Sequence, residues 1–122
     1  MANANDLSGY IRNPNNDNVL VKYAVIDAHL TGDTTLVAAV AGKKIRVISM
    51  FYLAAATVSV RFESGTGGTS LTGNLQHTAQ TGVVLNYNED GWFETAAGAL
   101  LNLELTGGGV IAVDGALSYI EV

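Results

Sequence analysis

Hydrophobic and polar residues alternate along much of the chain after residue 20. Segment 57–63 shows this most clearly, because single polar residues separate Val58, Val60 and Phe62. A period of two is that of a β-strand with one buried face, so these three side chains are predicted to point into a core. Apolar or alternating runs predict further strands at 21–30, 34–40, 43–55, 71–76, 82–87 and 101–105.

The end of the chain predicts a hairpin. Segments 110–113 and 116–122 are strand-like, and the intervening Asp114-Gly115 is a frequent two-residue turn. Segment 34–41 is ambiguous, because its short apolar run also fits a helical turn. Eight or nine short strands with glycine-rich turns and no sustained helical period indicate an all-β protein, an antiparallel sandwich or barrel.

One predicted strand is apolar on both faces. Strict alternation through 44–53 places Ile48, Met50 and Tyr52 on one face. The opposite face then carries Ile45, Val47, Phe51 and Leu53. A strand with one solvated face should be polar on that side. We therefore expect Ile48, Met50 and Tyr52 to form a subunit interface. The alternative is that a loop or the N-terminal segment folds over this face.

Residues 1–20 differ from the rest of the chain. They are rich in asparagine and aspartate, which favour turns over regular strands, and they hold the single proline. We expect an extended N-terminal arm, anchored by Leu7, Tyr10 and Ile11, that precedes one domain spanning 21–122. The arm is either a frayed terminus or a clip onto a neighbouring subunit.

The overall charge excludes several classes of partner. Six lysines and arginines against eleven acidic residues give a net charge of -5, which disfavours binding to nucleic acid or to an anionic membrane. Charged residues make up only 14% of the chain, so part of the surface is expected to be covered by partners or copies. There is no cysteine, and neither a signal peptide nor a membrane-spanning run is expected.

A few residues could hold a metal ion. Asp27 and His29 lie two apart, so on a strand they point the same way and could share one. A surface or interface pair is the simpler interpretation. Glu89, Asp90 and Glu94 could supply oxygens to calcium, although turn acids are usually only solvated. We expect no bound metal or other cofactor.

The sequence does not predict an enzyme. His77 lies in a polar segment and is expected to be solvated, and no serine sits in a nucleophile-elbow pattern. The segment Gly65–Gly68 lacks the lysine and serine or threonine of a phosphate loop. An exposed Trp92 beside carboxylates would suit a sugar, but a tryptophan capping the end of a sandwich core is more common.

The segment 91–105 carries a distinctive pattern. It has the form G-x-F-x-T-A-A-G-x-x-L-x-L and is followed by the closing segment 115–122. With the segments 42–49, 58–64 and 71–73, it resembles small structural proteins of tailed-phage virions, among them capsid decoration (cement) proteins. The resemblance covers roughly residues 21–122.

That resemblance implies a fold and a function. It implies a jelly-roll-like β-sandwich, presented as a homotrimer that binds the major capsid protein on the outer head surface and stabilises the shell. Such a protein is made in the cytoplasm of the bacterial host. The resemblance says nothing about residues 1–20, and we separately expect this arm to contact the capsid through Leu7, Tyr10, Ile11 and Arg12. The alternative is a fibre or spike module that binds host glycans through Trp92 and the loop 65–69.

Overall fold

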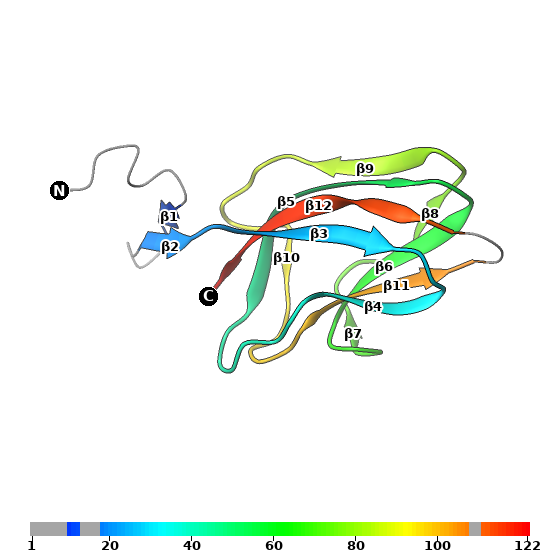
Figure 1. Ribbon diagram of the computed structural model, residues 1–122. Coiled ribbons are helices and arrows are strands. Elements are labelled where there is room, and N and C mark those ends of the chain that lie inside the picture. The colour runs from blue at the N-terminus through cyan, green and yellow to red at the C-terminus, as the bar shows by residue number, and fades with distance from the viewer. Residues whose placement is uncertain (1–9, 13–17, 108–110) are drawn as a thin grey trace.

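The computed structural model describes residues 10–12, 18–107 and 111–122. These residues form strands and no helix, and two antiparallel sheets pack face to face (Figure 1). The predicted antiparallel β-sandwich is confirmed. The strands are β1 (Tyr10–Arg12), β2 (Asn18–Leu20), β3 (Lys22–Ala28), β4 (Gly32–Val37), β5 (Ile45–Ala54), β6 (Val58–Ser64), β7 (Thr69–Ser70), β8 (Leu75–His77), β9 (Thr81–Leu85), β10 (Phe93–Glu94), β11 (Leu101–Thr106) and β12 (Val113–Glu121).

The order of strands is that of a jelly roll. In the first sheet β12 lies between β3 and β5, and β9 and β10 pair with the other edge of β5. In the second sheet β11 lies between β4 and β6, and β7 and β8 pair with the other edge of β6. The resulting orders, β3-β12-β5-β9 and β4-β11-β6-β8, are those of the two four-stranded sheets of a jelly roll. The first half of the ambiguous segment 34–41 is a strand, because β4 extends to Val37, and residues 38–41 lie outside any strand.

The core lies between the two sheets and is made of alternate residues from each strand. Val58, Val60 and Phe62 of β6 are buried there as predicted. Aromatic rings fill its centre, since Phe62 lies 5.3 Å from Phe93 and 6.1 Å from Tyr52 between ring centroids. Other buried members of this core are Ile26, Ala28, Val37, Ile45, Val47, Met50, Ala54, Leu101, Leu103, Leu105, Ile111, Val113 and Leu117.

The long strand β5 contains a bulge that reverses its faces. Ser49 pairs with Ser118 and Val47 pairs with Tyr119, so Ile48 is an extra residue between two ladder positions. Such an insertion shifts the alternation by one residue. Val47 therefore points into the core before the bulge, and Met50 points into it after the bulge.

The bulge contradicts the predicted subunit interface. Ile48 is 0% exposed, and Met50 and Tyr52 are each 3% exposed within the chain itself. They cannot offer a surface to another subunit. The prediction assumed strict alternation through the whole strand, and one inserted residue exchanges the two faces beyond it. The exposed residues of β5 are instead Phe51 and Leu53.

The predicted hairpin at Asp114-Gly115 is also wrong. These two residues lie inside β12, which runs unbroken from Val113 to Glu121. Residue 110, the start of the predicted preceding strand, lies outside the described residues. Gly115 has a different role from a turn, because a Cβ built there would lie 1.9 Å from the carbonyl oxygen of Phe51. The glycine allows β12 to approach β5 closely.

The described part of the arm is a small antiparallel ladder. β1 pairs with β2 through the positions Tyr10 and Leu20, Ile11 and Val19, and Arg12 and Asn18. This pair lies beside one end of the sandwich, ahead of β3 (Figure 1). Leu7 lies outside the described residues. Capsid contact through Leu7, Tyr10, Ile11 and Arg12 stays a prediction.

Replacing Gly115 should destabilise the fold. We expect Gly115→Ala to lower the free energy of unfolding by about 2 kcal/mol or more, because the new methyl group would overlap the backbone of β5. Urea denaturation would measure the change. Gly73→Ala is the matched control, since nothing lies within 4 Å of a Cβ built at Gly73. Equal stability of both variants would contradict the close approach.

Candidate functional site

The outer face of the second sheet is polar and its charges are paired. Arg61 of β6 contacts the carboxylates of Glu63, at 2.7 Å, and Glu104. The side-chain amide of Asn102 donates to Asp33 at 2.7 Å and to Glu63 at 2.9 Å. Burial acts to raise the pKa of Glu63, but the hydrogen bonds that its carboxylate accepts lower that pKa below its usual value. Glu63 and Asn102 are buried within this network, and the Oδ1 atom of Asn102 has no hydrogen-bond partner among the described residues.

The outer face of the first sheet is apolar. Phe51 of β5 lies between Val84 of β9 and Ala116 of β12, and Ala116 in turn pairs with Val25 of β3. One cross-strand row of four apolar residues therefore crosses the whole sheet. The large exposed residues on this face, here called the apolar face, are Tyr23 (76% exposed), Val25 (72%), Phe51 (56%), Leu53 (52%) and Val84 (75%).

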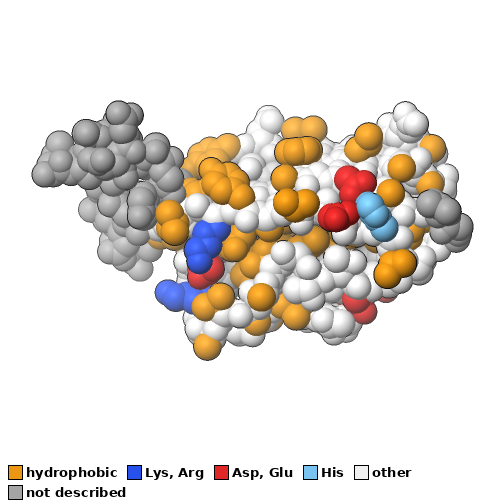
Figure 2. All heavy atoms as spheres, in the orientation of Figure 1, with side chains coloured by type: hydrophobic (Ala, Val, Ile, Leu, Met, Phe, Trp, Pro, Cys, Tyr) orange, Lys and Arg blue, Asp and Glu red, His pale blue; other side chains and the backbone are white. Residues whose placement is uncertain are grey.

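Figure 2 shows how this face looks from outside. Apolar side chains lie across β3, β5 and β9, while basic groups gather toward the end that carries β2. Isolated exposed apolar residues are common on proteins, but a row that spans four strands is not. A sequence with only 14% charged residues predicts an apolar surface of this kind. Strict alternation in β5, however, assigned that surface to Ile48, Met50 and Tyr52, whereas the exposed residues are Phe51 and Leu53.

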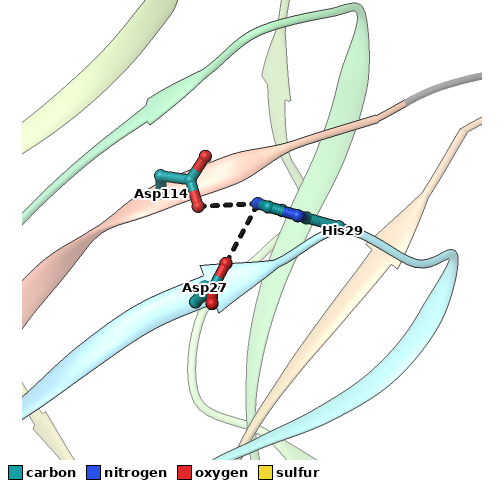
Figure 3. A group of neighbouring side chains, drawn as sticks. All are labelled: Asp27, His29 and Asp114. Atoms are coloured by element: carbon teal, nitrogen blue, oxygen red, sulfur yellow. Dashed lines mark hydrogen bonds and ion pairs between the residues drawn. The ribbon is translucent and has the colours of Figure 1, made fainter.

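An acid–histidine cluster borders the apolar face. Asp27 of β3 and Asp114 of β12 are direct cross-strand partners, and His29 follows immediately after β3. Figure 3 shows the imidazole directed between the two carboxylates. The Nε2 atom of His29 lies 2.8 Å from Oδ1 of Asp114 and 3.0 Å from Oδ1 of Asp27. All three side chains are more than half exposed.

The electrostatics of the cluster follow from this geometry. The hydrogen bond to Asp114 and the charge of that carboxylate raise the pKa of His29 above its ordinary value, and Asp27 adds to the effect. The sequence brought Asp27 and His29 together through their spacing of two. It did not find Asp114, because that residue is 85 positions from His29 and was assigned to a turn.

The predicted calcium ligands do not converge. Glu89 and Asp90 are exposed in a turn closed by a 2.9 Å hydrogen bond from Gly91 to Asn88. Glu94 is held instead by Arg46, at 2.9 Å, and by Lys44, at 3.2 Å. The three acids therefore have separate roles: two are solvated and one ties β10 to β5.

His77 is not the solvated residue that the sequence predicts. It lies at the end of β8, is 9% exposed, and its Nε2 is 2.8 Å from the hydroxyl of Tyr52. Burial raises the pKa of Tyr52 to about 12. His77 also borders a depression of about 570 Å³ between β6, β8 and the end of β11. Threonine and serine side chains line much of the rest of this depression.

Trp92 lies at the mouth of an apolar groove. It is 48% exposed, and its indole N–H donates to the carbonyl oxygen of Asn86 at 2.8 Å. The groove has a volume of about 260 Å³, and Thr72 is the one polar side chain among its lining residues within the described chain. The loop 65–69 is not part of that lining. The structure therefore brings neither polar groups nor the predicted loop to Trp92, and sugar recognition usually needs several convergent polar groups.

No protein-family model matches the chain, and comparison with curated proteins finds no match. Within the described residues, no helix is long and apolar enough to span a membrane.

The Glu94 contacts should make stability depend on pH. Burial opposes ionisation of Glu94, but hydrogen bonds from Arg46 and Lys44 lower its pKa below 4.5. A carboxyl group whose pKa is lower in the folded state stabilises the protein at pH values above its pKa in the unfolded state. This stabilisation is lost as the pH falls through the pKa of the folded state. Glu94→Gln should therefore cost about 0.5–1 kcal/mol at neutral pH and less in acid. Urea denaturation at pH 7 and pH 3.5, with Glu89→Gln as the exposed control, would measure it. An equal cost at both pH values would contradict this account.

Proposed function

We propose that this chain is a structural protein that associates with other protein subunits through its apolar face, and that it is a capsid decoration protein of a tailed phage. The observation that carries the proposal is the row of exposed apolar side chains across β3, β12, β5 and β9. A row of this kind on a folded domain marks an interaction surface more often than any chemistry. The polar, self-paired face of the second sheet stays in solvent.

The energetics of such an interface are favourable. An interface of ordinary size buries about 1,600 Å² in total, of which somewhat over half is apolar. At about 25 cal/mol per Å², that area contributes roughly 20 kcal/mol gross, against an association cost of roughly 4–15 kcal/mol. Large side chains such as Phe51 and Tyr23 are the residues expected to dominate the binding energy. They replace Ile48, Met50 and Tyr52 as the proposed contact residues.

The phage assignment draws on a different observation. The segment 91–105 and the closing segment resemble structural proteins of tailed-phage virions, a group that includes decoration proteins of the head. For a decoration protein the partner is the major capsid protein. The jelly-roll order of strands agrees with what the resemblance implies about the fold. On this proposal a homotrimer bridges capsid subunits, and the arm adds contacts to the shell.

A glycan-binding fibre or spike module is the second candidate. The half-exposed Trp92 at the mouth of the apolar groove is the observation that favours it. On that account Trp92→Ala would abolish binding on a glycan array while leaving the fold intact. Absence of binding by the unaltered protein to any glycan would count against the candidate.

Binding to undecorated phage heads tests the main proposal. We expect the unaltered protein to bind heads of the phage that encodes it, and Phe51→Lys to bind at least about tenfold more weakly, because the apolar partner surface cannot solvate an ammonium group. Cosedimentation over a range of protein concentrations would measure the affinities. Thr35→Lys is the matched control, since Thr35 is exposed on β4 in the other sheet.

The outcomes separate clearly. Equal binding by Phe51→Lys and Thr35→Lys would show that the apolar face is not the contact surface. No binding by the unaltered protein would reject the decoration function itself. Circular dichroism of each variant confirms that a loss of binding is not a loss of folding.

The oligomeric state in solution is a separate prediction. We expect sedimentation equilibrium of the unaltered protein to give the mass of a trimer, three times 12.7 kDa. A monomer at every accessible concentration would contradict the homotrimer. The head-binding experiment would then be the remaining test of the decoration function.

A further inference from the structure

We propose that Asp27, His29 and Asp114 form a binding site for a divalent transition-metal ion, and that Zn²⁺ fits it best. The ligands are Nε2 of His29 and one Oδ1 atom from each aspartate. The site lies beside the apolar face and uses none of its apolar side chains.

The geometry needs little adjustment to hold a metal. The three ligand atoms lie within 4.8 Å of one another, and the imidazole nitrogen is already 2.8 and 3.0 Å from the two oxygens. Tetrahedral zinc with ligand distances of about 2.0–2.1 Å separates its ligand atoms by about 3.4 Å. An outward shift of a few tenths of an ångström at each atom would therefore open the site. The backbone that carries the aspartates is a regular β-ladder and can stay in place.

The charge at this position also favours a divalent cation. Asp27 and Asp114 lie directly opposite each other on neighbouring strands, an arrangement in which like charges destabilise a sheet. Where the structure describes ion pairs of lysines and arginines, their partners are Glu63, Glu94, Glu104 and Glu121. His29 is the one cationic partner that the described residues provide for these aspartates. A divalent ion held by a neutral imidazole would balance both carboxylates.

The set of ligand atoms selects the kind of metal. One imidazole nitrogen with two carboxylate oxygens suits Zn²⁺ and its transition-metal neighbours. Mg²⁺ and Ca²⁺ prefer ligand sets made of oxygen alone. The exposure of all three side chains leaves the remaining coordination positions open to water. The competing account is a surface ion pair in which protonated His29 alone offsets the two aspartates.

Zinc titration of the chelator-treated protein tests the site. Isothermal titration calorimetry with ZnCl₂ should give saturable binding of one ion per chain. Because the chain has two histidines, NMR of the imidazole nitrogens can locate the ion. The His29 resonances should shift on adding Zn²⁺, whereas those of the buried His77 should not.

Variants complete the test. His29→Gln and Asp114→Asn should each weaken zinc binding at least about tenfold, as loss of a ligand does more than loss of a supporting contact. Asp90→Asn removes an exposed acid elsewhere and should bind as the unaltered protein does. The proposal is overturned if the unaltered protein shows no saturable binding, if Asp114→Asn binds as well as Asp90→Asn, or if the His77 resonances shift in place of those of His29.

Discussion

The extra residue Ile48 in β5 determines which side chains of that strand are buried and which are exposed. β5 is a central strand, paired with β12 on one edge and with β9 and β10 on the other. Before the bulge its inward residues are Ile45 and Val47, and after it they are Met50, Tyr52 and Ala54. The same shift turns Phe51 and Leu53 outward. The contribution of β5 to the core and to the apolar face therefore depends on one inserted residue.

Local pattern predicted much of the fold. The alternation in 57–63 gave β6 and its buried residues correctly, because that strand pairs with regular spacing over its whole length. The bulge could not be predicted from β5 alone. Strict alternation places one polar residue on each face, Arg46 on one and Ser49 on the other, so the sequence offers little contrast between the two possible alternations. Only the pairing with β12 specifies which residue is the extra one.

The sequence likewise predicted only part of the candidate site. The spacing of Asp27 and His29 places both on one side of a strand, and the structure brings them together. Asp114 could not be added from the sequence, because Asp114-Gly115 has the composition of a turn and the close approach that requires Gly115 is a tertiary contact. His77 was misassigned for a similar reason: its polar neighbours suggested solvent, whereas its position opposite Tyr52 buries it.

The pairing of β12 with β3 has a kinetic consequence. These strands come from opposite ends of the domain, and β12 lies between β3 and β5. The first sheet therefore cannot close until β12 has been synthesised. Folds dominated by such distant contacts form slowly. During this interval β3 and β5 have unpaired edges beside an apolar surface, a condition that promotes association between nascent chains.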